Sequence, residues 1–166
     1  IQSALASATR LRWRLGWRYE NHGGVIDGRF RGIYENHTHS SHNTGEVELL
    51  RILHERGADL SASVCAWDTN GVTPAHQASI VGDTELLRVL RDLGANLNAW
   101  DNDGLTPAHD ASGHGNTETL RVLHELSANL NAWDNHGMTP AHYASRCGHT
   151  VTLRVMHELG ANLDAW

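Results

Sequence analysis

Lysine is absent from this 166-residue chain, and all 13 of its basic residues are arginine. Cysteine occurs only twice, which is too few for a disulfide scaffold and suits a reducing compartment. No run of apolar residues approaches the length of about 18 that predicts a membrane-spanning helix. Apolar residues make up 40% of the chain and charged residues 19%, which excludes a disordered polyelectrolyte. Against one phenylalanine and three prolines, the chain holds six tryptophans.

Charge is distributed unevenly along the chain. Residues 1–34 hold six arginines against two acidic residues, whereas the remaining residues carry a balance of −10. A basic N-terminal arm therefore precedes an acidic body, and this asymmetry suggests two parts with different roles. The acidic body favours a partner with a basic surface.

The tetrapeptide Thr-Pro-Ala-His occurs three times at intervals of 33 residues, starting at Thr73, Thr106 and Thr139. All three prolines of the chain lie in these motifs. A capping threonine followed by proline predicts the start of a helix at each copy. A degenerate copy without the Thr-Pro pair begins at Asn36. The chain therefore divides into an arm and four units: 1–35, 36–72, 73–105, 106–138 and 139–166, the last of which is cut short.

Each unit predicts two helices and a tight turn. The first helix should end at a glycine, which is Gly45 in the first unit and Gly82 in the second. Leucines at helical spacing then mark a second helix. Gly94 fits the left-handed position after that helix, whereas Ser127 breaks the rule in the next unit. The segment 101–104, Asp-Asn-Asp-Gly, indicates a tight turn.

The 33-residue period, the Thr-Pro-Ala-His variant of Thr-Pro-Leu-His, the glycines after the helices and the Gly-Ala-Asn-Leu-Asn-Ala exit resemble ankyrin repeats over residues 36–166. The resemblance implies an all-α solenoid of stacked helix-turn-helix units with projecting hairpin loops. It also implies protein–protein recognition through the concave face and the loop tips, usually without catalysis. One unit cannot bury its own apolar helix faces. Because no polar capping unit follows the last helix, we expect the array to continue in a longer protein or to be covered by a partner.

Four of the six tryptophans occupy one position of the repeat, directly before the turn aspartate: Trp67, Trp100, Trp133 and Trp166. Stacked helices lie 8–10 Å apart, so the four indoles would form a row of about 30 Å. An exposed row would be a candidate binding stripe, because tryptophan is enriched at binding hot spots. The alternative is that each indole packs on the loop of the next unit and holds the array together.

Partner specificity is expected where the units differ. By the resemblance, the candidate contacts are Gln77, Asp110, His114, Tyr143 and Arg146 on the first helices and Asn102, Asp103, Asn135 and His136 on the turns. Tyr143 and Arg146 are the expected anchors. Ordinary solvated surface is the alternative for each residue taken alone.

Thirteen histidines raise the question of a metal site. His76, His109 and His142 recur one unit apart, about 10 Å from one another, whereas zinc ligands lie about 2 Å from the ion. One ion cannot join them, so we expect them to bond the adjacent loops. A denser group at His37, His39 and His42 lacks a completing cysteine or acid. Since no nucleophile–base pair, phosphate-binding loop or dinucleotide fingerprint is present, no enzyme activity, metal or cofactor is predicted.

The arm alternates polar and apolar residues over 10–19, which is the period of a β-strand, and residues 25–34 could return as a second strand of a hairpin. A helix over 1–18 is the alternative. The candidate contact residues of the arm are Arg12, Trp13, Arg14, Trp17 and Arg18. The arm is expected to cover the first helix pair or to dock to a partner. Binding of nucleic acid or an anionic membrane is a third interpretation, which the acidic body opposes.

The sequence thus predicts a non-enzymatic scaffold that binds another protein, as a subunit or module of a larger assembly. The alternatives are a structural spacer that contacts its neighbours through its arm and ends, and a regulatory ankyrin region of a longer enzyme. The expected location is intracellular and reducing. The cytoplasm fits this, and the acid-free, arginine-containing start of the arm also resembles a transit segment for a plastid or mitochondrion.

Overall fold

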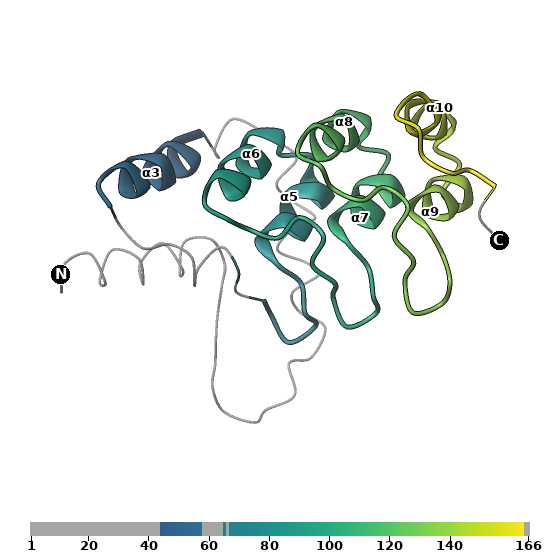
Figure 1. Cartoon of the computed structure of the whole chain (residues 1–166), viewed down its shortest axis with the longest axis horizontal. Helices are drawn as coiled ribbons and strands as arrows, with labels where there is room; N and C mark the ends of the chain where they lie inside the picture. The colour runs from purple at the N-terminus through teal and green to yellow at the C-terminus, as the bar shows by residue number, and fades with distance from the viewer. Residues whose placement is uncertain (1–43, 58–64, 66, 165–166) are drawn as a thin grey trace. The chain divides into compact units, whose positions relative to one another are not determined.

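The computed structural model describes residues 44–57, 65 and 67–164 (Figure 1). The chain divides into two compact parts, an N-terminal part (Ile1–Ser63) and a C-terminal part (Val64–Trp166). The predicted arm and its contact residues, the group at 37–42 and the last tryptophan all lie outside the described residues. The two alternatives for the arm, hairpin and helix, therefore both stay predictions.

Helix α3 (Thr44–Glu55) is the helix described in the N-terminal part. It corresponds to the second helix expected in the degenerate repeat at 36–72. The prediction that Gly45 ends a preceding helix was wrong, because α3 already begins at Thr44 and includes this glycine in its first turn. A glycine destabilises mainly the middle of a helix, so the first turn tolerates it.

The C-terminal part (Val64–Trp166) contains a series of three helix pairs among its described residues. The first helices of the pairs are α5 (Pro74–Val81), α7 (Pro107–Gly113) and α9 (Pro140–Arg146). The second helices are α6 (Thr84–Asp92), α8 (Thr117–Glu125) and α10 (Thr150–Glu158). The first helices contact one another in order, and so do the second helices, which gives two layers joined by hairpin-like loops (Figure 1). The described residues form helices and no strands, as predicted for an all-α solenoid.

In the three helix pairs, the threonine-proline and glycine signals of the sequence mark the helix ends correctly. Thr73, Thr106 and Thr139 each take an extended conformation directly before a helix whose first residue is proline. Their backbone and the fixed φ of proline suit a helix start. After the second helices, the chain turns through the left-handed region, with φ of 85° at Gly94 and 64° at Ser127. Ser127 is the one non-glycine with positive φ in the described part of the chain.

The core lies between the two helix layers. Small residues of the first helices and large residues of the second helices are its main members: Ala75, Ala78, Ala108, Ala111, Ala141, Ala144, Leu87, Leu90, Leu120, Leu123 and Met156. Alanines allow the first helices to approach closely, and the leucines fill the space behind them. Within the described ranges, no helix combines the length and apolarity that a membrane span requires.

Each loop tip is bonded to the tip of the next loop. The backbone N–H of Asn102 donates to the carbonyl of Asn70 (2.9 Å), and its side-chain amide donates to the carbonyl of Thr69 (2.9 Å). Asn135 repeats this arrangement, donating to the carbonyls of Asp103 (3.1 Å) and Asn102 (3.0 Å). The loops therefore form a continuous hydrogen-bonded edge along the array.

Replacing Gly104 by alanine is expected to lower the free energy of unfolding by about 2 kcal/mol, because left-handed backbone is costly for other residues and the new Cβ collides with the next loop. The φ of Gly104 is 79°, and an added Cβ would lie 2.7 Å from the backbone nitrogen of Asn135. Gly160→Ala is the matched control, since its φ is 77° but no atom lies within 4 Å of the new Cβ. Urea unfolding compares the two variants. Equal losses would contradict the close loop packing.

Candidate protein-binding surface

The turn aspartates fix the loops that carry the tryptophans. In each loop one carboxylate oxygen accepts backbone N–H groups two and four residues ahead, at 2.8 and 2.9 Å for Asp68 and at 3.0 and 2.8 Å for Asp101. Asp134 does the same at 2.8 and 2.7 Å. Such side-chain-to-backbone bonds define a turn. Since Trp67, Trp100 and Trp133 each directly precede one of these aspartates, the loops present these three indoles at equivalent places.

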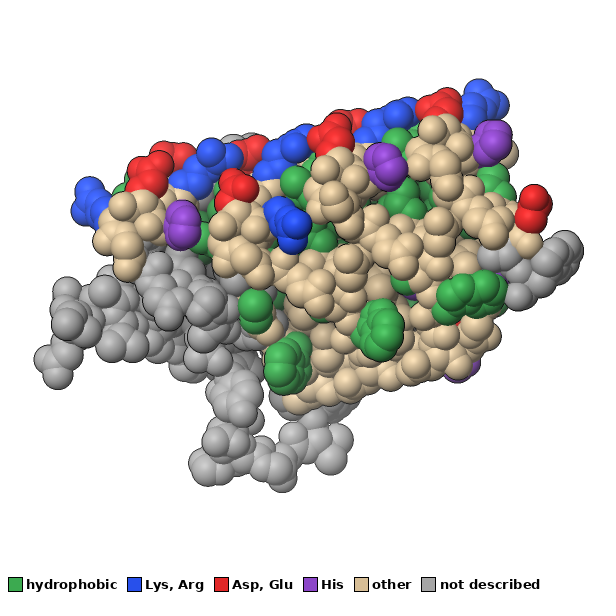
Figure 2. All heavy atoms as spheres, in the orientation of Figure 1, with side chains coloured by type: hydrophobic (Ala, Val, Ile, Leu, Met, Phe, Trp, Pro, Cys, Tyr) green, Lys and Arg blue, Asp and Glu red, His purple; other side chains and the backbone are tan. Residues whose placement is uncertain are grey.

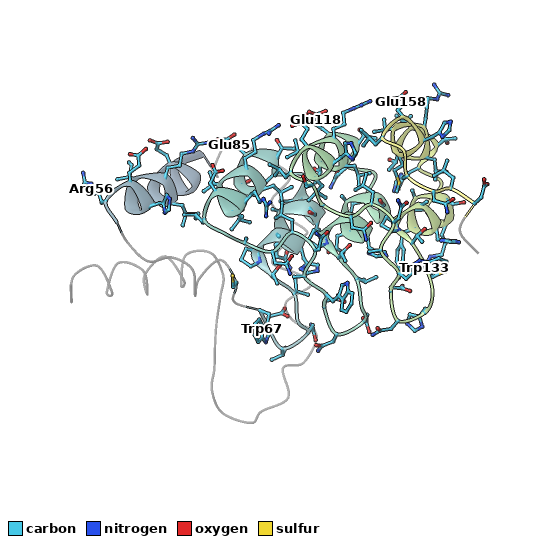
Figure 3. The ribbon with its side chains drawn as sticks, viewed as in Figure 1. Arg56, Trp67, Glu85, Glu118, Trp133 and Glu158 are labelled. Atoms are coloured by element: carbon cyan, nitrogen blue, oxygen red, sulfur yellow. The ribbon has the colours of Figure 1, made fainter. Side chains whose placement is uncertain are left out.

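The described members of the tryptophan row (Trp67, Trp100 and Trp133) are exposed. Their exposed fractions are 66%, 71% and 46%, respectively. Figure 3 shows Trp67 and Trp133 on the loop side of the array, away from Glu85, Glu118 and Glu158 on the second helices. On the face drawn in Figure 2, apolar side chains form separate patches over the loops, surrounded by uncharged polar surface. These exposed fractions favour the exposed row over the alternative of packed indoles.

A hollow of about 480 Å³ lies between the first two indoles. It is lined by Cys65, Trp67, Gly71, Thr73, Asn96, Ala99, Trp100 and Asn102. None of these side chains is a carboxylate, a guanidinium or an imidazole. The sequence interpretation missed Asn96 and Ala99. Their signal was the repeated Gly-Ala-Asn-Leu-Asn-Ala exit, which marks the family but does not show that the segment borders the row.

The turn residues predicted as partner contacts have two different roles. Asn102 and Asn135 are exposed, but their side-chain amides bond the preceding loop and so also hold the loops together. Asp103 and His136 are exposed, and no hydrogen bond of their side chains to another described residue is formed. The latter pair therefore has the freer side chains for a partner.

The first-helix candidates differ in exposure. Gln77, Asp110 and Tyr143 occupy one repeat position and are half-buried, whereas His114 and Arg146 are exposed. One ring nitrogen of His114 lies 2.8 Å from the carbonyl of Asp110. Burial raises the pKa of Asp110 to about 8, and the nearby carboxylate of Asp101 adds to the effect. Asp110 is thus a carboxyl group that holds its proton at neutral pH.

Tyr143 is fixed on three sides. Its hydroxyl donates to Oδ2 of Asp134 at 2.8 Å, its ring meets the ring of His109 edge-on at 5.5 Å, and the guanidinium of Arg146 lies 5.1 Å from its ring centroid. Burial and the bond to Asp134 raise the pKa of Tyr143 to about 12. Burial opposes ionisation of Asp134, but hydrogen bonds from the Met138 N–H and from Tyr143 prevail and lower its pKa. The two expected anchors therefore contact each other in a preorganised pair.

The motif histidines are structural, as predicted. Nδ1 of His109 accepts the backbone N–H of Thr106 (3.0 Å), and Nε2–H donates to the carbonyl of Met138 in the next loop (3.1 Å). His76 makes the same pair of bonds, to Thr73 (3.1 Å) and Leu105 (3.0 Å). Burial lowers the pKa of both histidines, so they remain neutral at physiological pH. Within the described ranges, no group of three or more metal-ligating side chains is found.

The outer face of the second helices is charged and solvated. Arg88 pairs with Glu125 at 2.7 Å and Arg121 with Glu158 at 3.1 Å, each joining neighbouring units. All four side chains are about half exposed, so each pair contributes little to stability. Figure 2 shows the alternating basic and acidic groups along the edge that carries α6, α8 and α10. Substitutions of exposed residues on this face can therefore serve as controls.

Comparison with protein-family models finds a match to ankyrin repeats, in three copies, over residues 82–165. A search of curated proteins finds no significant match. The matched segment is half of the chain, and it contains α6 and both helices of the last two pairs together with their connecting loops. Its stacked helix pairs, proline-initiated first helices and bonded loop tips are the architecture that the match implies. The chain belongs to the ankyrin repeat family.

Proposed function

We propose that this chain is a non-catalytic scaffold module that binds another protein through the tryptophan row and the variable first-helix residues. Ankyrin repeats generally act as protein–protein interaction modules, and they typically lack enzymatic activity. The observation that carries the proposal is the exposure of three indoles at one position of successive repeats. Aligned exposed apolar side chains of this size are uncommon on a surface that serves no partner.

Charge supports a partner with a basic surface. On the second helices, arginine and glutamate pair across units and largely cancel. On the loops, Asp101 and Asp103 form no ion pair with an arginine among the described residues. A basic segment of the partner would compensate these acidic groups and speed association.

We further propose that the chain works as a subunit or module of a larger assembly in a reducing compartment. The exposed apolar row and the Tyr143–Arg146 pair would provide separate contacts, as expected of a protein that holds more than one neighbour. Cys65 and Cys147 are both free thiols at the surface, which suits a reducing compartment.

Capture of partners from a cell extract by three forms of the chain, with His124→Ala as a control variant, tests the proposal. The forms are the full chain, a variant with Trp100→Ser and Trp133→Ser, and a chain without residues 1–35. We expect the tryptophan variant to lose its partner by about 30-fold or more, which is typical of hot-spot residues. His124→Ala on the outer helix should retain it.

Thermal melting shows whether the tryptophan variant stays folded, which its exposed indoles predict. If removal of residues 1–35 releases every partner while the tryptophan variant keeps them all, the chain binds through its arm and the proposal fails. Loss of melting stability together with loss of capture would instead assign the indoles a role in holding the array.

A further inference from the structure

We propose that the tryptophan row binds a proline-rich segment of the partner in the polyproline II conformation, with prolines three residues apart. This inference rests on the proposed protein-binding function and names the chemistry of the segment that the row takes. Three features of the row carry it: the open space between indoles, the spacing of the repeat and the unused hydrogen-bond donors.

The space between Trp67 and Trp100 suits a small apolar ring. Trp67 and Trp100 line the 480 Å³ hollow together with the small residues Gly71 and Ala99. Because these two residues have little or no side chain, the space between the indoles stays open. Its lining carries no charged group, so a ligand gains from apolar contact and hydrogen bonding rather than from ion pairs. Proline rings between aromatic side chains make this kind of contact.

The spacing of the row matches a polyproline II helix. Such a helix has three residues per turn and rises about 3.1 Å per residue, so every third residue returns to the same side after about 9.3 Å. Stacked helices lie about 8–10 Å apart, and the row has one tryptophan per repeat. A β-strand returns to the same side after about 6.7 Å and would fall out of register with the indoles. Prolines at every third position would thus stay in register with the tryptophans of successive repeats.

Unused donors favour polyproline II over a bound α-helix. An α-helix with anchors seven residues apart would also repeat at about 10.5 Å, but its carbonyl groups are already bonded within the helix. The carbonyls of a polyproline II segment are free to accept. An indole N–H is only a donor, and those of Trp67, Trp100 and Trp133 have no partner among the described residues. The row therefore offers donors that such a segment needs.

The segment belongs to another protein and not to a second copy of this chain. This chain has only three prolines, at positions 74, 107 and 140, and they are 33 residues apart. Each of them begins a helix and lies in the folded array. No segment of the chain thus carries prolines three residues apart.

Fluorescence polarisation with labelled synthetic peptides and the full chain tests the inference. The first peptide has proline at every third position, the second has the same composition with scrambled prolines, and the third is an amphipathic helix with leucines seven residues apart. We expect the first to bind at least about tenfold more tightly than the other two. Trp100→Ala should weaken this binding by about tenfold or more, and Trp100→Phe by less, since it keeps the ring but loses the donor.

His157→Ala, on the exposed outer side of α10, is the control and should bind like the unchanged chain. Equal affinity for the ordered and scrambled peptides would overturn the inference, and so would tight binding of the helical peptide or no effect of Trp100→Ala. If no peptide binds but the tryptophan variant still loses its partner in the capture experiment, the polyproline inference fails while the protein-binding function stands. If the variant also keeps its partner, both fail.

Discussion

Replacing His109 by alanine is expected to lower the free energy of unfolding by about 3 kcal/mol, because buried groups lose their partners and a cavity remains. The side chain is fully buried and bridges two units. Without it, the backbone N–H of Thr106 and the carbonyl of Met138 both lose a hydrogen bond. The edge-on contact with the ring of Tyr143 is lost as well. Urea unfolding followed by circular dichroism measures the change.

His124→Ala is the control, since His124 is exposed on α8 and its loss should change the free energy by less than about 0.5 kcal/mol. The pH dependence gives a second check. Burial lowers the pKa of His109 from 6.5, so below pH 6.5 the unfolded chain binds more protons than the folded one. The stability that His109 confers is therefore complete above pH 6.5 and decreases in acid. A gap between wild type and His109→Ala that widens in acid would contradict a neutral, buried histidine.

The sequence predicted the elements whose causes lie within one repeat. Thr106 and the proline after it begin a helix by local backbone preference, and Gly94 ends one by its φ. The role of His109 was also predictable, because metal distances exclude a shared ion. Gly45 shows the limit of this reasoning, since a glycine signals a helix end only where a helix precedes it, and α3 begins at Thr44.

The sequence could not predict contacts that depend on the preceding or following unit. Asn102 was chosen because the turns differ, yet its amide bonds the loop before it. Asn116 was not singled out at all, although its amide donates to the carbonyls of Ser79 and Ile80 in the preceding unit at 2.8 and 2.9 Å. In both cases the acceptor is a backbone carbonyl about one repeat away, and no sequence pattern marks it.

The position of the candidate surface was predictable, but the exposure and orientation of its side chains were not. The repeat located the tryptophan row, but exposure of its indoles required the loop conformation. Tyr143 was predicted as an anchor from its chemistry alone. Its fixed orientation depends on Asp134, whose carboxylate was assigned only to the turn. A carboxylate has enough acceptor sites for the turn and the tyrosine together, and only the structure shows that both are used.

Asp110→Asn is expected to raise the free energy of unfolding at about pH 9 by about 3 kcal/mol. This is roughly half of the free energy that corresponds to the full pKa shift. The smaller value applies because the half-buried carboxyl keeps some contact with water. Burial and the charge of Asp101 raise the pKa of Asp110 from 3.8 to about 8. Between these values the folded chain binds more protons than the unfolded one, so wild-type stability falls as pH rises from about 4 to about 8. Asparagine stays neutral throughout, and the variant escapes this loss.

Unfolding of wild type and Asp110→Asn at several pH values isolates the effect, since other titrating groups are common to both. The difference should be near zero at about pH 4, grow towards pH 8 and then level off. Asp103→Asn, at an exposed turn position, is the control and should change stability by less than about 0.5 kcal/mol. A constant difference across this range would show that Asp110 ionises freely in the folded chain. Residues that lower the stability of a protein are expected at its functional sites. A basic group of a partner placed beside Asp110 would favour the charged carboxylate and so remove the loss of stability that its ionisation causes.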